Sequence, residues 1–340
     1  MPLKGFTCPP QVPTAGTRND TTWCLSKCPH PCAAPPLLAA ILASESTNHH
    51  KGAYISASMI AGNNCPRALV YERTYDFWEL PQKRYWSFRG THAHSMIEGA
   101  QASVTPYGWL QELHMTTKIT YKDLPAPILD ADENFTGKYD DTQPLVITVG
   151  GTCDAYNPKL PDAPMWDFKS MADMKADMFI RGSKGGTFSP HLEDRWVWQL
   201  NIYRYLLSKT EIPKEVKKAL KLKTKYYPTP KFLAIQGISM MSIPRTGQAY
   251  PLRTGYNTEL KNIDDIPILE EAVVEKYIRE RALEWYRWLV LQQETPVISS
   301  AMKWMCKGCV FNGEIIPGER CHPEAERKQG KADQETLELE

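Results

Sequence analysis

The sequence lacks the features of a membrane protein or an exported protein. Its 340 residues contain no apolar run near the roughly 18 residues that a membrane-spanning helix needs. The N-terminus does not show the order of charged, apolar and small residues that marks a signal peptide. We therefore expect a protein with no membrane partner that stays inside the cell, in its cytoplasm.

An excess of charge of either sign is also missing. The chain has 40 lysines and arginines against 39 aspartates and glutamates, which leaves a formal net charge of +1 at pH 7. This balance excludes an overall polycation, so any contact with nucleic acid must come from a local patch of charge. Hydrophobic residues make up 42% of the chain, which predicts one large core with at most a small appendage.

Cysteine, in contrast, is plentiful, with nine residues in the chain. In a chain without an export signal, cysteines favour metal sites over disulfides. They fall into a group of four near the N-terminus, a split group of four and one isolated residue: Cys8, Cys24, Cys28 and Cys32, then Cys65 with Cys306, Cys309 and Cys321, and lastly Cys153. This distribution predicts two metal sites, with Cys153 as a small core residue.

The two groups of cysteines suit different metals. Residues 1–36 are rich in proline and cysteine and have little apolar periodicity, so we expect a bound metal to hold their shape. Zinc is the usual metal of such a compact knuckle, with His30 as a competing ligand. The thiolates of the split group suit either zinc or an iron–sulfur cluster, and their spacing does not decide between the two.

The remaining pattern predicts an α/β domain over residues 37–323 and a charged, disordered tail over 324–340. A helix starts after Pro36, and Ser56 or Ser58 caps a second one. The other predicted helices are 88–102, 190–208 and 270–293; the predicted strands are 111–121, 145–156, 164–169 and 231–243; and 123–144 is predicted as a loop. In the last helix one apolar face is expected from Val274, Ile278, Leu283, Tyr286 and Val290.

Two of the predicted strands carry acidic residues that could meet at one edge of a hairpin. Asp154 ends the first of these strands, and Asp167 lies in the next, two residues before Lys169. Because side chains alternate along a strand, Asp167 and Lys169 share a face, while Phe168 points into the core. Asp154 and Asp167 would bind a divalent metal, with Lys169 over the same phosphate, as in a metal-dependent phosphodiesterase. The alternative is a surface Asp–Lys pair.

Two predicted helices add polar pairs at a spacing of four residues, which places each pair on one helix face. His94 would complete the metal shell, and Glu98 would orient it. Gln199 and Tyr203 would bind the substrate phosphate or fix Lys169. The alternatives are a histidine that is simply hydrogen-bonded and a buried polar pair that stabilises helix packing.

Taken in order, the segments GTHAHSMIEG, GGTCDAY, WDFKS and QLNIYRY resemble the motifs of RecB-like PD-(D/E)XK nucleases. The sequence Cys65-Pro-Arg before them and Cys306, Cys309 and Cys321 after them resemble the iron–sulfur branch of that family, although the gap before Cys321 is longer than usual. That branch includes CRISPR-associated RecB-like exonucleases and the nuclease domain of AddB-type helicase-nucleases. The resemblance covers residues of about 55–325.

The resemblance implies a restriction-endonuclease-like core, in which a mixed central sheet is flanked by helices, and a helical periphery closed by a 4Fe-4S cluster on the split cysteine group. It also implies Mg²⁺- or Mn²⁺-dependent cleavage of DNA. We expect an exonuclease that acts on single strands or DNA ends in recombination, repair or phage DNA processing, with a helicase or recombination partner, in a prokaryotic or phage-infected cell. Two alternatives stay open, namely a catalytically silent DNA-binding or assembly module on the same fold and an enzyme that acts on RNA.

A lysine-rich segment offers one local patch for nucleic acid. Six lysines lie between residues 214 and 225 and are followed by Tyr226 and Tyr227. They could contact phosphates beside a stacking platform, although such a run is also typical of a solvated helix face.

Overall fold

The computed structural model describes residues 3–8, 13, 16–28, 39, 54–62, 65–74, 77–79, 81–99, 101–131, 133–172, 187, 193–240, 266–295, 309, 314–316 and 319–320. The chain divides into two compact units. One comprises Met1–His49, Asn64–Phe88 and Gln293–Glu340, and the other comprises His50–Asn63 and Arg89–Gln292. We call them the cysteine unit and the sheet unit. Among the described helices, none is long and apolar enough to cross a membrane.

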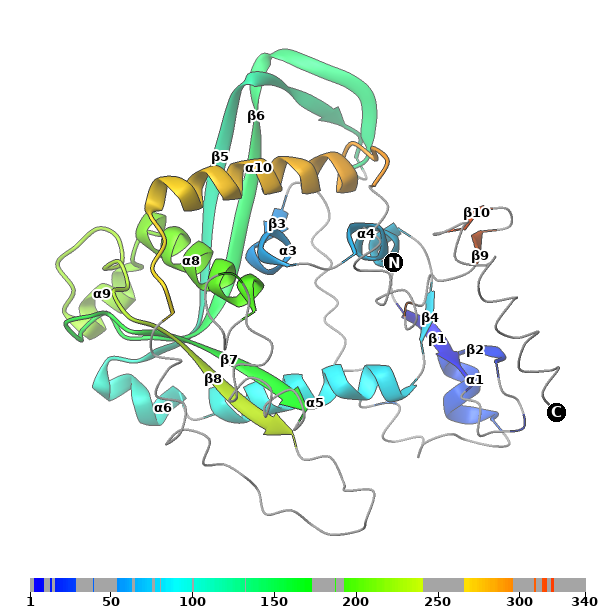
Figure 1. Cartoon of the computed structure of the whole chain (residues 1–340), viewed down its shortest axis with the longest axis horizontal. Coiled ribbons are helices and arrows are strands. Elements are labelled where there is room, and N and C mark those ends of the chain that lie inside the picture. The colour runs from blue at the N-terminus through cyan, green and yellow to red at the C-terminus, as the bar shows by residue number, and fades with distance from the viewer. Residues whose placement is uncertain are drawn as a thin grey trace, which may run out of the picture. The chain divides into compact units, whose positions relative to one another are not determined.

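The sheet unit contains a mixed five-stranded sheet flanked by helices (Figure 1). Its strands are β3 (Tyr54–Ser56), β5 (Leu110–Leu129), β6 (Phe135–Tyr156), β7 (Met165–Ala172) and β8 (Leu233–Met240). β6 is antiparallel to β5 and β7 and parallel to β3, and β7 is parallel to β8. The predicted α/β class with a mixed central sheet is therefore confirmed.

The helices of this unit are α3 (Ala57–Ala61), α6 (Gln101–Val104), α8 (Asp194–Lys209), α9 (Lys214–Leu220) and α10 (Glu271–Leu289), and α5 (Pro81–Glu98) runs into it from the cysteine unit. A short 3-10 helix, η1 (Thr105–Tyr107), precedes β5. The predicted cap of α3 is confirmed at Ser56, whose hydroxyl accepts a hydrogen bond from the Met59 amide at 3.3 Å. The predicted helix 88–102 is wrong at both ends, because α5 starts at Pro81 and stops before Gly99, a residue type that favours helix ends.

The core of the sheet unit forms where α3, α8 and α10 pack together and α8 packs against β5 and β6. Val274, Ile278, Tyr286 and Val290 are buried as predicted, whereas Leu283 is only half-buried. Ala282 and the fully buried Trp285 complete the face. The indole of Trp285 donates a hydrogen bond to the Met59 carbonyl at 3.0 Å, which satisfies its one polar atom inside the core.

The predicted loop 123–144 is wrong, because β5 and β6 continue through it as a long two-stranded ribbon (Figure 1). The turn is closed by the Asp130 carboxylate, which accepts a hydrogen bond from the Asn134 amide at 2.8 Å. Pro125, Pro127 and Pro144 lie where the pairing register shifts. Proline is tolerated at such irregularities because no ladder hydrogen bond from its nitrogen is required there.

The cysteine unit holds a small sheet in the order β2-β1-β4, formed by β1 (Leu3–Thr7), β2 (Arg18–Asp20) and β4 (Phe77–Glu79). It also holds α1 (Thr21–Ser26), α4 (Pro66–Thr74) and the short strands β9 (Glu314–Ile316) and β10 (Glu319–Arg320). Buried Arg67 joins distant parts of this unit, since its guanidinium donates a hydrogen bond to the Thr295 carbonyl at 2.8 Å. The predicted boundaries at residues 36 and 323, the helix after Pro36 and the tail 324–340 lie outside the described residues.

Five of the eight cysteines predicted to bind metal are described, all in the cysteine unit. Cys8 and Cys24 are buried, and both contact Asn19. The Asn19 side chain donates a hydrogen bond to the Cys8 sulfur at 3.2 Å, and the Cys24 thiol donates one to the Asn19 carbonyl at 3.9 Å. Cys28, Cys65 and Cys309 are half-buried. Cys32, Cys306 and Cys321 lie outside the described residues, so both cysteine sites stay predictions. In the sheet unit, Cys153 is fully buried, as predicted for a core residue.

The predicted stacking platform beside the lysine run is wrong. Lys225 forms an ion pair with Glu211 at 2.7 Å, and its ammonium lies over the exposed ring of Tyr226. Tyr227 is buried, with its ring edge-on to that of Tyr156, so it has no free face for a nucleic-acid base. The lysines of α9 can still contact phosphates, but not beside a pair of exposed aromatic rings.

Candidate active site

β7 carries the pair that the sequence analysis placed on one face. Asp167 is buried, Lys169 is half-buried, and the Lys169 ammonium lies 2.6 Å from Oδ2 of Asp167. β8 pairs with β7 along its whole length, and β6 pairs with its first two residues. Asp167 and Lys169 are therefore paired with β8 and lie just beyond the last residue of β7 that pairs with β6.

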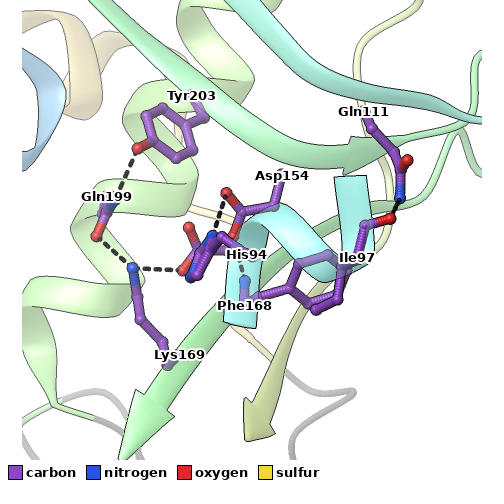
Figure 2. A network of polar contacts seen from close by, with 9 residues as sticks. His94, Ile97, Gln111, Asp154, Phe168, Lys169, Gln199 and Tyr203 are labelled. Atoms are coloured by element: carbon purple, nitrogen blue, oxygen red, sulfur yellow. Dashed lines mark hydrogen bonds and ion pairs between the residues drawn. The ribbon is translucent and has the colours of Figure 1, made fainter. Parts of the chain in front are cut away.

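Asp154 lies near the end of β6, next to β7, and is also buried. Its Oδ2 accepts a hydrogen bond from the backbone amide of Phe168. Its Oδ1 lies 3.6 Å from Nδ1 of His94 on α5 (Figure 2). One carboxylate thus connects the β6–β7 junction to the helix that carries the histidine.

Phe168 differs from the prediction that it points into the core. It is half-buried, and its ring contacts that of His94 edge-on, with 6.3 Å between the centroids (Figure 2). The aromatic contact helps to fix the orientation of the imidazole.

α8 supplies the polar pair of the last motif, on the lysine side of β7. Lys169 donates a hydrogen bond to Oε1 of Gln199 at 3.2 Å, and Nε2 of Gln199 donates one to the Tyr203 hydroxyl at 2.7 Å (Figure 2). Tyr203 is buried against Gly151 of β6, where a Cβ atom would lie only 2.6 Å from the tyrosine ring. The glycine is what allows α8 to approach this closely.

Glu112 of β5 belongs to the site and was missed by the sequence analysis. Donor atoms of His94, Glu112 and Asp154 all lie within 4.8 Å of one another. Its signal in the sequence is weak, because a single glutamate in the segment QELHMTT belongs to no motif. Only the pairing of β5 with β6 shows that Glu112 lies near Asp154. Within the described residues, this group of three is the one found with the geometry of a metal site.

Negative charge accumulates at this site. Burial raises the pKa of Asp154, and the charge of Asp167 raises it further. Desolvation of its carboxylate, followed by the charges of half-buried Glu98 and of Asp167, raises the pKa of Glu112 to about 7. Burial likewise raises the pKa of Tyr203, which keeps its hydroxyl neutral. A bound cation would relieve the repulsion between the carboxylates.

The donor set fits a hard divalent cation. Carboxylate oxygens suit Mg²⁺ and Mn²⁺, and imidazole is accepted by Mn²⁺ and other transition metals. Donor atoms of His94, Glu112 and Asp154 all lie within 4.8 Å of one another, which is close enough for them to approach a single ion. Small side-chain movements would therefore let His94, Glu112 and Asp154 bind one ion.

Comparisons with known proteins identify no family. No family model matches the chain, and no curated protein matches it. Among solved structures, one titled "Crystal structure of SSO0001" is similar over 81% of this chain and 91% of that chain, with 15% sequence identity and a TM-score of 0.36. A likeness at that level supports no conclusion about function.

Proposed function

We propose that this protein is a divalent-metal-dependent DNA nuclease of the RecB-like PD-(D/E)XK type, built on a restriction-endonuclease-like core. It would act on single strands or DNA ends in recombination, repair or phage DNA processing. One observation carries the proposal: Asp154, Asp167 and Lys169 meet where β6 pairs with β7, and His94 lies beside Asp154. These are the residue types that metal-assisted phosphodiester hydrolysis requires.

A Mg²⁺ or Mn²⁺ ion would be held by His94, Asp154 and Asp167. Bound there, the ion would polarise a phosphoryl oxygen and neutralise the negative charge that develops on it. The Phe168 amide holds one oxygen of Asp154 and leaves the other facing His94. Glu98 follows His94 by one helical turn on α5 and faces the same side.

Lys169 supplies the positive charge on the protein side of the reaction. Its ammonium is held between Oδ2 of Asp167 and Oε1 of Gln199, which leaves its third proton available. That proton can orient an attacking water or a phosphoryl oxygen, and the charge stabilises the transition state. Gln199 and Tyr203 act as positioning residues, since the amide of Gln199 is fixed by the tyrosine hydroxyl.

The cysteines belong to the proposal as cofactor ligands. We assign Cys65, Cys306, Cys309 and Cys321 to a 4Fe-4S cluster, and Cys8, Cys24, Cys28 and Cys32 to zinc. Cys65 and Cys309 lie in the same compact unit although they are far apart in the sequence, which supports a shared ligand. Such a site would convert the free energy of cofactor binding into folding stability.

Cleavage of end-labelled DNA tests the proposed function. Protein purified without oxygen would be incubated with 5′- and 3′-labelled single- and double-stranded DNA in Mg²⁺ or Mn²⁺. We expect metal-dependent products, and Lys169→Ala should lower the rate by roughly 100- to 1,000-fold, because it removes one transition-state donor. The matched control is Lys276→Ala, which removes a lysine paired with Glu280 on α10, outside the site and outside the lysine run, and should cut normally.

Two outcomes contradict the proposal. If folded Lys169→Ala protein cuts as fast as the unaltered chain, the lysine is not catalytic and the site is misassigned. If the chain binds Mn²⁺ and DNA but makes no products from any substrate, it is a DNA-binding or assembly module.

A further inference from the structure

We infer that Glu112 is a metal ligand of this site, together with His94 and Asp154. The inference rests on the proposed function, since it names a further ligand of the same site. It adds one residue to the expected ligand set of His94, Asp154 and Asp167.

The pairing of β5 with β6 places Glu112 on the metal side of the sheet. Gln111 is the partner of Ala155, and Leu113 is the partner of Cys153, so Glu112 and Asp154 occupy the positions between these two pairs. Donor atoms of the two residues lie within 4.8 Å of each other. Two carboxylates at this spacing repel each other unless a cation lies between them.

The backbone at Glu112 is also unfavourable. Its φ of 47° lies in the left-handed region, which non-glycine residues rarely adopt inside a strand. Such strain persists where the surrounding structure enforces it, and it is concentrated at functional sites. In the part of the chain that the structure describes, no lysine or arginine forms an ion pair with Glu112. A bound metal ion accounts for a strained acid placed against a second acid.

Asp167 is engaged differently. Its Oδ2 lies 2.6 Å from the Lys169 ammonium, and it is not one of the three residues whose donor atoms gather within 4.8 Å. The ion pair occupies Oδ2 and leaves Oδ1 as the Asp167 oxygen that is open to an ion.

Titration of the full-length protein with Mn²⁺, followed by calorimetry and by electron paramagnetic resonance, tests the ligand set without DNA. Replacing an outer partner of a metal ligand usually weakens binding about 10- to 100-fold. We expect Glu112→Gln to weaken Mn²⁺ binding by about 100-fold or more, as His94→Ala does.

The matched control is Glu133→Gln. Glu133 is another exposed glutamate with positive φ, 64°, but it lies in the turn of the ribbon. It should bind Mn²⁺ normally. Unchanged Mn²⁺ affinity in Glu112→Gln, with binding lost in His94→Ala, would overturn the inference.

Glu112→Gly separates a ligand from a structural residue. Glycine tolerates positive φ and carries no charge, so the metal-free variant should melt at a higher temperature than the unaltered chain. Its melting temperature should no longer rise when Mn²⁺ is added. A metal-free variant that melts lower would show that Glu112 is needed for the fold and would contradict the inference.

Failure of the inference and failure of the proposed function give different results. Mn²⁺ binding that depends on Glu112, in a protein that cuts no DNA, would overturn the nuclease and keep the ligand. DNA cleavage by a protein whose Mn²⁺ affinity does not change on substitution of Glu112 would support the nuclease and overturn Glu112 as a ligand.

Discussion

Lys169 is positioned by two residues with different chemistry. Asp167 supplies a negative oxygen from the same strand, and Gln199 supplies a neutral oxygen from α8. The amide of Gln199 is oriented in turn by the Tyr203 hydroxyl, so the orientation of the lysine depends on a tyrosine that does not touch it. The dependence is indirect, and removing the hydroxyl should weaken catalysis rather than abolish it.

We therefore expect Tyr203→Phe to slow single-turnover cleavage by about tenfold, because Gln199 loses its acceptor while Lys169 keeps both oxygens. Loss of one hydrogen bond should lower the free energy of unfolding by about 1 kcal/mol. Tyr205→Phe is the control, since it removes a hydroxyl from another buried tyrosine of the same helix. A Tyr203→Phe variant as inactive as Lys169→Ala would show that the hydroxyl itself contacts the substrate.

At the scale of residues, motif order in the sequence selected six side chains that the structure brings together: His94, Asp154, Asp167, Lys169, Gln199 and Tyr203. Their proposed roles stay predictions. Glu112 was not predictable, because its place depends on the register between two strands. The ribbon between these strands has a turn at residues 130–134 and several register shifts, inside the segment that the sequence analysis predicted as a loop.

At the scale of elements, two adjacent glycines of β6, Gly150 and Gly151, determine how closely β3 and α8 approach that strand. A Cβ atom at Gly150 would lie 2.8 Å from the Tyr54 ring, and one at Gly151 would lie 2.6 Å from the Tyr203 ring. Real Cβ atoms do not come so close to other atoms. Both tyrosines therefore pack on β6 at positions that only glycine permits.

Gly151→Ala should push Tyr203, and α8 with it, away from β6. We expect the free energy of unfolding to fall by about 1–3 kcal/mol, as for other overpacked cores. Cleavage should fall by about 100-fold, because Gln199 moves away from Lys169 and small displacements at an active site cost that much. Urea denaturation and single-turnover rates would measure the two effects.

Val146→Ala is the control for Gly151→Ala, because it alters an exposed residue of the same strand and should leave cleavage unchanged. Full activity of a destabilised Gly151→Ala variant would show that the position of α8 does not govern catalysis.

The elements themselves were predictable to different degrees. α8 and α10 follow from the helical spacing of their apolar residues, and the structure starts each within a few residues of the prediction. The ribbon was not predictable, because the propensity of Pro125, Pro127 and Pro144 opposes strand formation and only pairing across the ribbon overcomes it. Pairing of β1 with β4 was not predictable either, since it joins segments about 70 residues apart.

At the scale of the whole molecule, the cysteine unit is assembled from three separate stretches of chain. Arg67 shows how closely they are joined, because two of its nitrogens donate to Thr295, which lies 228 positions later in the chain. Cys65 precedes Arg67 by two residues, and Cys309 follows Thr295 in the same unit. The Arg67–Thr295 hydrogen bonds already bring the two ends of this long stretch of chain together. A cofactor that binds Cys65 and Cys309 would be a second link between the same two ends.

Cys65→Ser and Cys309→Ser should each lower bound iron and the melting temperature together. Closing a loop of more than 100 residues stabilises a fold by about 4 kcal/mol in the disulfide case, and a four-thiolate cluster should act similarly. Iron content and thermal unfolding of protein handled without oxygen would check this. Cys153→Ala is the control, since Cys153 is buried in the core of the sheet unit and should not alter iron content. Zinc in place of iron, or stability indifferent to both substitutions, would contradict the cluster assignment.

The order of the candidate site along the chain has a consequence for its synthesis. His94, Glu112 and Asp154 all precede Lys169, Gln199 and Tyr203. Their strands, β5 and β6, pair with each other through a short turn, so they can associate while later residues are still being translated. α8 and β8 emerge afterwards, and only then do Gln199 and Tyr203 hold the lysine in place. A nascent chain on the ribosome would therefore gain the capacity to hold an ion before it gains the capacity to cut.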